Sequence, residues 1–369
     1  MTCIRTPITD PVTSSSVYAE IDLAALRHNL GVVRKHAPAA GVMAVVKSMA
    51  YGHGAVPVAR ALADSADALG VARFEEGVAL REAGLATPIV VLEGPTRAEQ
   101  LEAAFKLDLQ LTIHHESQLP LLQDYADEPL DCWLKVDTGM HRLGFPVDRM
   151  RTLFERLRQL PAVASLRVMT HLACADDLTN PATANQLQRL VEATGGLQTE
   201  KSIANSAGIL AWPDSHADWV RPGLMLYGAS PVMGKAADDY DLQAVMTLKA
   251  PLIAINDLEA GEAVGYGGTW LAPEAMPLGV VGIGYGDGYP RHIGAGAQVL
   301  LNGQRVPVVG RVSMDMITLD LRGVRAQVGD IVTLWGKGLP ADEVATWANT
   351  IPYTLFCGVT ARVERRYLD

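Results

Sequence analysis

Lys47 is the first residue whose type and position could do chemistry. It follows the apolar run Val42–Val46 and precedes the loop SMAYGHG. The last residue of such a strand lies at the carboxyl edge of its sheet, where barrel enzymes keep their active sites. A desolvated lysine there can form a Schiff base with an aldehyde cofactor. A strand-end lysine can also simply extend its ammonium into water, and position alone favours this second interpretation.

Three other features could take part in binding or catalysis. His171 directly follows the apolar run Val163–Thr170, and Tyr266 stands between glycines in VGYGG. Alone, His171 is typical of a hydrogen-bonded structural histidine, and the nearby Cys174 does not make it a metal site. Tyr266 alone is typical of a turn. The glycines of GYGDGY (284–289) suggest a nucleotide loop, but no helix follows them, so a turn is the better interpretation.

The elements that position these residues are predicted to be strands, seen as apolar runs, that alternate with helices. Leu23–His36 has apolar residues at helical spacing, and Phe74–Gly84 is a second helical stretch that ends on a glycine. This alternation predicts βαβ units and a parallel sheet. The predicted strands, two weak ones included, are Val42–Val46, Ala68–Val71, Ile89–Leu92, Leu109–Ile113, Cys132–Val136, Val163–Thr170, Ser202–Ala204 and Leu224–Tyr227. Eight strands close a (β/α)8 barrel. A doubly wound open sheet is the alternative, although no glycine fingerprint follows the first strand.

A second domain of different composition and periodicity follows the barrel. The pattern changes after about Asp239, and residues Leu242–Gly336 are rich in Val, Ile, Gly and Pro, with little helical periodicity. Strands are predicted at Gln298–Leu301, Val306–Val309 and Ile331–Leu334, with a hairpin turn at Asn302-Gly303 and a helix at Ala341–Asn349. The predicted fold class is therefore α/β, an N-terminal (β/α)8 barrel with a C-terminal mostly β domain. The predicted limits are a disordered tail at 1–16, the barrel at 17–238 and the β domain at 239–369.

Composition excludes several classes of function. The formal net charge of −10 provides no basic field for nucleic acid or anionic lipid. No run of about eighteen apolar residues predicts a membrane span, and the polar first sixteen residues lack the apolar region of a secretory signal. The four cysteines form no CxxC pair, so neither a zinc site nor a disulfide framework is expected. These features predict a reduced, cytoplasmic protein.

Eight segments, in order along almost the whole chain, resemble the motifs of alanine racemases, which are fold-type III enzymes dependent on pyridoxal phosphate. The segments are AVVKSMAYGHG (44–54), WLKVDTGMHRLGF (133–145), THLACAD (170–176), NSAGIL (205–210), WVRPGLMLYG (219–228), VGYGGTW (264–270), GYGDGYPR (284–291) and GRVSMDM (310–316). The resemblance implies the same barrel and β domain. It also implies interconversion of L- and D-alanine, which supplies D-alanine for bacterial peptidoglycan or serves its breakdown.

The resemblance assigns two catalytic bases. Lys47 is implied to bind pyridoxal phosphate covalently and to act as one base, with Tyr266 as the other. Racemisation needs such a pair, because one base removes the Cα proton and the other returns one from the opposite face. His171 and Arg221 are implied to assist Tyr266, and Arg221 to face the pyridine nitrogen of the cofactor. The family is a homodimer in which this tyrosine reaches into the partner's barrel.

Further residues are implied to bind the cofactor and the amino-acid substrate. Arg142 matches a contact of the cofactor's phenolic oxygen and the substrate carboxylate, and Lys135 matches a lysine carbamate that orients this arginine. The backbone at Met314, beside Asp315, matches a second contact of the substrate carboxylate. The implied donors to the cofactor phosphate are Tyr51, Ser206, Gly223, Leu224 and Tyr353. The residues implied to line the entry corridor to the active site are Asp176, Arg291 and Arg311. No metal is implied.

The sequence departs from the family directly after the cofactor lysine. Ser48 and Met49 stand where Ala-Asn or Ala-Asp is usual. Local repacking around a flexible thioether and an altered pocket with broader substrate choice are both open. The alternatives to alanine racemisation are a broader-specificity racemase acting, for instance, on serine, a fold-type III decarboxylase, and a protein that only carries pyridoxal phosphate. The segments VGYGG and GRVSMDM count against the last two.

Overall fold

The computed structural model describes residues 16–125 and 128–369 and contains two compact units. The barrel unit comprises Asp22–Val245 and the three residues Tyr367–Asp369. Among the described residues, the second unit comprises residues 16–21 together with Met246–Arg366. The predicted tail at 1–16 lies, apart from Ser16, outside the described residues. The domain limits drawn from the sequence stay a prediction.

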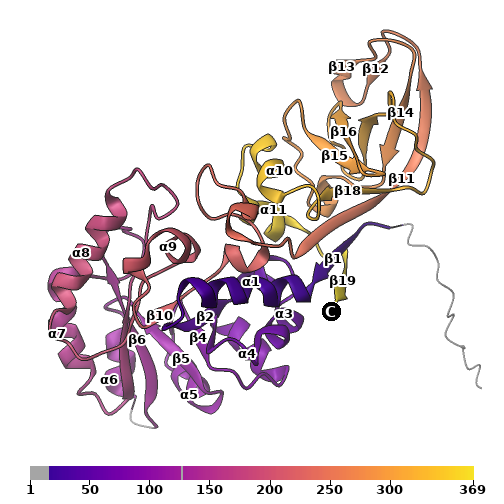
Figure 1. The fold of residues 1–369 in the computed structure, drawn as a ribbon. Coiled ribbons are helices and arrows are strands. Elements are labelled where there is room, and N and C mark those ends of the chain that lie inside the picture. Colours follow the sequence, from indigo (N-terminus) through magenta and orange to yellow (C-terminus); the bar gives the residue numbers. More distant parts are fainter. Residues whose placement is uncertain (1–15, 126–127) are drawn as a thin grey trace, which may run out of the picture. The chain divides into compact units, whose positions relative to one another are not determined.

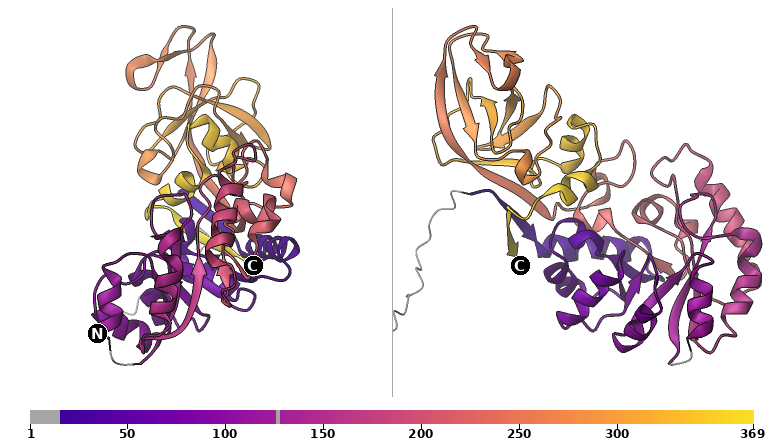
Figure 2. Two further views of the ribbon diagram at one scale, coloured as in Figure 1. Left: turned by 90° about the vertical axis from the view of Figure 1, so that its left-hand side faces the viewer. Right: turned by 180° about the vertical axis from the view of Figure 1, so that it is seen from behind.

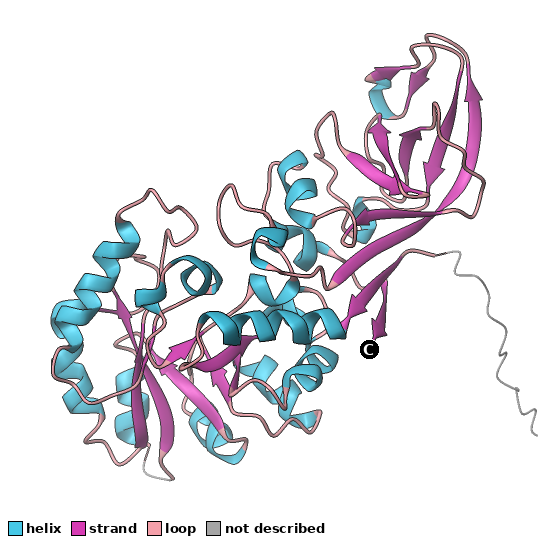
Figure 3. Cartoon of the chain, viewed as in Figure 1, coloured by secondary structure: helices cyan, strands magenta, loops and turns pink. Residues whose placement is uncertain are grey.

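Eight parallel strands form a closed barrel in the first unit (Figures 1 and 3). Each strand of the ring pairs with the one that follows it along the chain, and the ring closes where Trp219 pairs with Gly41. The strands are β2 (Gly41–Val45), β3 (Ala68–Val71), β4 (Ile89–Val91), β5 (Leu109–Ile113), β6 (Leu130–Asp137), β8 (Val163–Met169), β9 (Lys201–Ser202) and β10 (Trp219–Val220). The predicted (β/α)8 barrel is confirmed, and the open sheet is excluded because no strand of this ring has a free edge.

The eighth strand of the barrel was predicted at the wrong place. Residues Leu224–Tyr227 form a 3₁₀ helix, η2, in which all four side chains are buried. The strand that closes the barrel is β10, which is only two residues long and pairs with β2 and β9. An apolar run of four residues does not distinguish a strand from a buried helical turn. The strand was therefore predicted at Leu224–Tyr227, which is a longer apolar run than β10.

Helices surround the barrel strands, as the views in Figure 2 show. Asp22 caps α1, since its side chain accepts a hydrogen bond from the Ala25 amide at 2.8 Å. The helices are α1 (Leu23–His36), α3 (Ala55–Leu62), α4 (Phe74–Glu82), α5 (Glu99–Lys106), α6 (Gln118–Asp124), α7 (Val147–Leu157), α8 (Ala182–Thr194) and α9 (Ser206–Ala211), with the short strand β7 (Phe145–Pro146) beside β6. Inside the ring, buried side chains from different strands pack into one core, among them Met43, Val90, Trp133 and Met169.

The second unit is built on antiparallel strands, which confirms the predicted β domain. Six of them close on themselves, because β11 pairs with both β14 and β18. The strands are β1 (Tyr18–Asp22), β11 (Met246–Leu258), β14 (Met276–Val281), β15 (Gln298–Leu301), β16 (Gln304–Val309), β17 (Ile317–Asp320), β18 (Ile331–Trp335) and β19 (Glu364–Leu368), with the helices α10 (Ala341–Trp347) and α11 (Pro352–Gly358). Asn302 and Gly303, with φ of 50° and 77°, make the predicted turn between β15 and β16.

Two short 3₁₀ segments of this unit carry motifs noted in the sequence. The segment η4 (Tyr266–Gly268) joins the short strands β12 (Ala263–Val264) and β13 (Trp270–Leu271). The segment η5 (Tyr285–Asp287) lies within GYGDGY, where Gly288 has a φ of 107°. No helix follows it directly, in agreement with the predicted turn. Among the described residues, no helix is long and apolar enough to cross a bilayer.

Candidate active site

Lys47 begins a turn whose following residues adopt the left-handed helical conformation. It is separated from strand β2 by one residue and opens the segment α2 (Lys47–Tyr51), and the next four residues, Ser48–Tyr51, all have φ between 51° and 56°. None of these residues is a glycine, and the left-handed conformation costs an L-residue about 1–2 kcal/mol. Four in succession store several kcal/mol, so the surrounding structure must hold the turn in place.

Contacts from two other elements hold the turn. The Ser48 amide donates to the Glu76 carboxylate of helix α4 at 2.6 Å. The Tyr51 ring stacks on Tyr227 of η2 with centroids 4.7 Å apart, and the Tyr227 hydroxyl donates to the Val45 carbonyl at the end of β2 at 2.9 Å. The last residue of β2 and the last residue of the turn are therefore both in contact with the same tyrosine.

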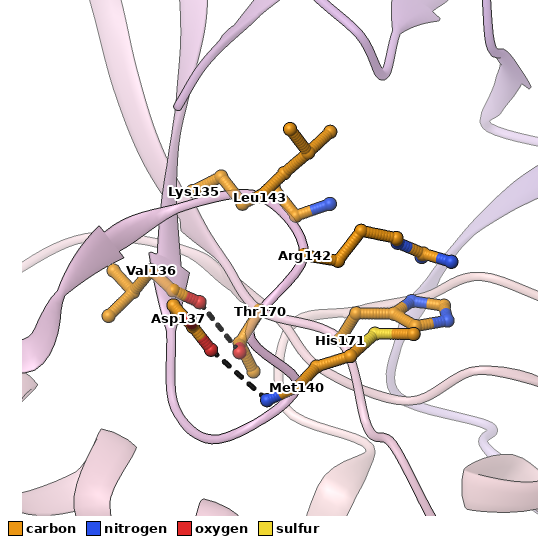
Figure 4. Close-up of a pocket in the computed structure, with 8 residues that line it drawn as sticks. All are labelled: Lys135, Val136, Asp137, Met140, Arg142, Leu143, Thr170 and His171. Carbon is orange, nitrogen blue, oxygen red and sulfur yellow. Dashed lines mark hydrogen bonds between the residues drawn. The ribbon is translucent and has the colours of Figure 1, made fainter. Parts of the chain in front are cut away.

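Positive charges gather around Lys47. The pKa of Lys135, on β6, falls from 10.5 to about 8 because the side chain is buried and because Arg221, Arg142 and Lys47 are close enough to repel its charged form. Figure 4 shows Lys135, Arg142 and His171 lining one pocket. Asp137 offsets part of the charge, but one of its oxygens also accepts from three backbone amides, 139 to 141. The pocket therefore favours an anionic ligand.

Arg221 and His171 form the buried side of this cluster. The Arg221 guanidinium donates to the Ser202 hydroxyl at 2.6 Å and to the Thr170 carbonyl, and burial lowers its pKa to about 10. It therefore keeps its proton at neutral pH. Burial, and then the charge of Arg221, hold the pKa of His171 well below its usual value. Since a guanidinium can only donate, Nδ1 of the neutral His171, 3.4 Å from Arg221 Nη2, accepts, and Nε2 carries the ring proton.

A small cradle fits the phosphate of the implied cofactor. Gly223 donates its amide to the Ser206 hydroxyl at 2.8 Å. A Cβ at Gly223 would lie 2.5 Å from the Tyr51 hydroxyl oxygen and 3.9 Å from the Ser206 oxygen, so only glycine leaves this space open. Two hydroxyls and the backbone of Gly223 and Leu224 thus meet beside the Lys47 turn. Hydroxyls and loop amides of this kind are the donors that phosphate oxygens need.

The structure divides the predicted site residues between the two units. The barrel unit brings together Lys47, Tyr51, Lys135, Arg142, His171, Ser206, Arg221, Gly223 and Leu224. Tyr266, Met314 and Tyr353 belong to the second unit. Tyr266 is 68% exposed and framed by Gly265 and Gly267, both with positive φ. The Met314 carbonyl accepts from the Gly286 amide at 2.8 Å, which joins the GRVSMDM and GYGDGY segments.

Sequence reasoning missed the residues that shape the Lys47 turn. Glu76 and Tyr227 lie on other elements, far from Lys47 in sequence; Glu76 lies outside the eight motif segments, and Tyr227 lies within WVRPGLMLYG but was given no role there. Glu76 does stand at the third position of helix α4, where a glutamate commonly caps the helix start, and it accepts from the Arg73 amide. Its second contact, to Ser48, depends on how the barrel strands are ordered.

Comparison with known proteins places this arrangement. The model of the alanine racemase N-terminal domain matches residues 21–231, and that of the alanine racemase C-terminal domain matches residues 245–367. This chain belongs to the alanine racemase family. Two alanine racemases, from Aeromonas hydrophila and Nitrosococcus oceani, are 51% and 53% identical to it. The alignments cover 95% and 94% of this chain and 99% and 98% of those proteins.

Solved alanine racemases share the fold over nearly their whole length. The biosynthetic alanine racemase from Pseudomonas aeruginosa aligns with a TM-score of 0.93 at 43% identity, covering 96% of this chain and all of that one. The alanine racemase from Bartonella henselae, solved with covalently bound pyridoxal phosphate, aligns with a TM-score of 0.87 at 30% identity, with the same coverage. Members of the alanine racemase family are isomerases that depend on pyridoxal phosphate, and the pocket of this member fits that cofactor in charge and in its phosphate cradle.

Proposed function

We propose that this protein interconverts L- and D-alanine, with pyridoxal phosphate bound through Lys47. The observation that carries the proposal is the position of Lys47, at the end of a barrel strand, between a cationic pocket and a phosphate cradle. The identity of about one half to alanine racemases over nearly the whole chain supports alanine as the substrate. The bound cofactor supplies an electron sink that makes the substrate Cα proton acidic.

Two bases then move the proton on opposite faces of Cα. The Lys47 amine takes and returns it on one face, and the Tyr266 phenolic oxygen does so on the other. An ordinary tyrosine has a pKa near about 10, so Tyr266 needs a neighbouring cation or hydrogen bond to act as a base. His171, neutral and with its proton on Nε2, and the permanently charged Arg221 are the groups that we assign to this task.

Arg221 also determines which reaction follows proton removal. Its guanidinium donates and cannot accept, so a ring nitrogen of the cofactor paired with it stays unprotonated. The bound cofactor would then be a weaker electron sink, and return of a proton to the substrate Cα would be favoured over protonation elsewhere. This choice favours racemisation over transamination.

Arg142 and Met314 orient the substrate. The exposed guanidinium of Arg142 can bind the amino-acid carboxylate through two parallel hydrogen bonds, and the Met314 backbone provides a second contact. Lys135 lies close enough to Arg142 to repel it while both are cations. We therefore assign a carbamate to Lys135, because it replaces this repulsion with attraction between an anion and the guanidinium.

Two wider features belong to the proposal. We infer a homodimer in which Tyr266 serves the barrel of the partner, since this residue is 68% exposed within one chain. We also infer a cytoplasmic enzyme, because Cys132, Cys174 and Cys357 are free thiols, as expected in a reducing compartment.

The test is optical. The holoenzyme is mixed with L-alanine and the circular dichroism of the amino acid is followed to zero, first for the parent and then for Lys47→Ala and Tyr266→Phe. We expect decay with the parent and none with Lys47→Ala. A flat trace from a parent that binds pyridoxal phosphate would refute the activity and favour a carrier. Serine in the same assay tests the broader-specificity alternative, in which serine would racemise at a rate comparable with alanine.

Transfer of deuterium separates the two bases. In ²H₂O, a variant that lacks one base can still exchange the Cα proton of the enantiomer that its remaining base faces. We expect Tyr266→Phe to exchange one enantiomer of alanine without racemising it. Equal exchange of both enantiomers by this variant would remove Tyr266 from its role.

A further inference from the structure

A tyrosine from the far end of the chain sits on the loop that carries Lys47. Tyr367, on strand β19, belongs to the barrel unit. Its hydroxyl donates to the His53 carbonyl at 3.1 Å. A Cβ at Gly54, whose φ is 101°, would lie 2.0 Å from the same hydroxyl oxygen. The hydroxyl therefore occupies a space that only a glycine leaves, which makes this a close and specific contact.

Backbone hydrogen bonds connect this contact to the left-handed turn. The Gly52 amide donates to the Ser48 carbonyl at 3.0 Å, and the Gly54 amide donates to the Met49 carbonyl at 2.8 Å. The His53 ring is fully buried, and its Nδ1 lies 2.9 Å from the carbonyl oxygen of Tyr51. Residues 48 to 54 are thus one hydrogen-bonded piece, with Lys47 at one end and the Tyr367 hydroxyl at the other.

We propose that Tyr367 is a positioning residue that holds residues 48 to 54 in register, and thereby aims Lys47 and the Tyr51 hydroxyl at the cofactor. This role rests on the proposed function of Lys47. A turn of four left-handed residues relaxes unless neighbours oppose it. Glu76 contacts its first residue, Ser48, and the Tyr227 ring packs on the rings of Tyr51 and His53. Tyr367 adds a contact with the backbone of His53 and Gly54, directly before helix α3 begins at Ala55.

The same short segment offers a matched control. Asp369 lies 3.3 Å from Arg27 of helix α1, in an ion pair whose side chains are 85% and 43% exposed. An exposed pair of this kind contributes little to stability. Asp369→Asn therefore alters the last three residues without touching the loop, whereas Tyr367→Phe removes one hydroxyl and keeps the ring.

The experiment compares the parent, Tyr367→Phe and Asp369→Asn as holoenzymes. Hydrogen exchange is measured at the amides of residues 52 to 54, and the loss of pyridoxal phosphate on dilution is followed by the absorbance of the bound cofactor. Loss of one hydrogen bond, here a partly buried one, corresponds to a factor of up to about ten. For Tyr367→Phe we expect about tenfold faster exchange at these amides, about tenfold faster cofactor loss and a reduced kcat with an unchanged KM. Asp369→Asn is expected to behave as the parent.

Three results would overturn the proposal. Parent-like exchange and cofactor loss in Tyr367→Phe would make the tyrosine a packing residue. Faster exchange with parent-like cofactor loss would mean that the contact orders the loop without aiming Lys47. Faster exchange throughout the barrel, with a lower Tm, would indicate a general structural role. If instead the parent binds pyridoxal phosphate and Lys47→Ala binds it equally well, the assignment of Lys47 fails, and the role of Tyr367 fails with it.

Discussion

Replacing Lys135 with glutamine is expected to stabilise the protein in CO₂-free buffer at neutral pH. Glutamine keeps the polarity and most of the length of lysine but carries no charge. The fall in the Lys135 pKa from 10.5 to about 8 corresponds to about 3 kcal/mol, which is the cost of keeping this ammonium charged in the folded protein. The variant avoids this cost, so its free energy of unfolding should exceed that of the parent by up to this amount.

The gain depends on pH in a definite direction. The folded pKa of Lys135 lies below the unfolded value, so between pH 8 and 10.5 the unfolded chain binds more protons and the stability of the parent rises with pH. The cost is complete below about pH 8 and disappears as the pH reaches 10.5. The advantage of Lys135→Gln is therefore expected to be largest at pH 7 and to be lost by pH 10.5.

Urea unfolding followed by tryptophan fluorescence measures both effects. Lys235→Gln, at an exposed lysine, is the matched control and is expected to change stability little at either pH. A Lys135→Gln variant that is no more stable than the parent at pH 7, or whose gain persists at pH 10.5, would refute the reasoning. Bicarbonate adds a second arm, because the neutral amine of Lys135 can add CO₂, releasing a proton and leaving a carbamate anion. Bicarbonate should then stabilise the parent and leave Lys135→Gln unchanged, and an intact mass that shows a plain amine would remove the carbamate.

Three further substitutions test the local geometry. Met49→Asn, at a φ of 56°, is expected to raise the free energy of unfolding by about 1 kcal/mol in thermal unfolding, because asparagine tolerates the left-handed region better. Unchanged kinetics on alanine and serine in the same variant would support repacking over an altered pocket. Gly223→Ala places a methyl group 2.5 Å from the Tyr51 hydroxyl, so pyridoxal phosphate should bind more than about tenfold more weakly in a titration, with the far-UV spectrum retained. Gly303→Ala, at a φ of 77° in open space, should cost about 1 kcal/mol in urea unfolding and leave activity unchanged, and a larger loss would mean that the hairpin matters beyond its turn.

Long, periodic elements could be predicted from the sequence, and very short ones could not. Helix α1 and strands β3 and β5 begin and end at the predicted residues, since each is a clear apolar pattern between polar or turn residues. Strand β10 has two residues and gives almost no periodic signal, whereas the neighbouring Leu224–Tyr227 is a stronger apolar run that is buried as a 3₁₀ helix. All of Leu224–Tyr227 is buried, whereas in β10 only Val220 is, so the apolar pattern reported burial and not the type of element.

The candidate site shows the same division. Lys47 could be proposed from its place at a strand end, and the motif resemblance named the remaining groups. The left-handed turn was beyond prediction, because Ser48–Tyr51 contains neither glycine nor asparagine, the residues that signal positive φ. Its supports, Glu76, Tyr227 and Tyr367, meet only after the barrel has closed, so no local window of sequence contains them together.

The pairing of β1 with β11 has a consequence for synthesis of the chain. Tyr18 lies opposite Lys249, so a ribosome must make every barrel strand before β1 can find its partner. The barrel is in effect an insertion between two adjacent strands of the second unit. All eight barrel strands are therefore synthesised before the second unit can begin to fold. During this interval β1 is an unpaired strand beside a folding barrel, a state that invites pairing with another chain. Slow translation after residue 245 would prolong this exposure. It ends once β11 has left the ribosome and can pair with β1.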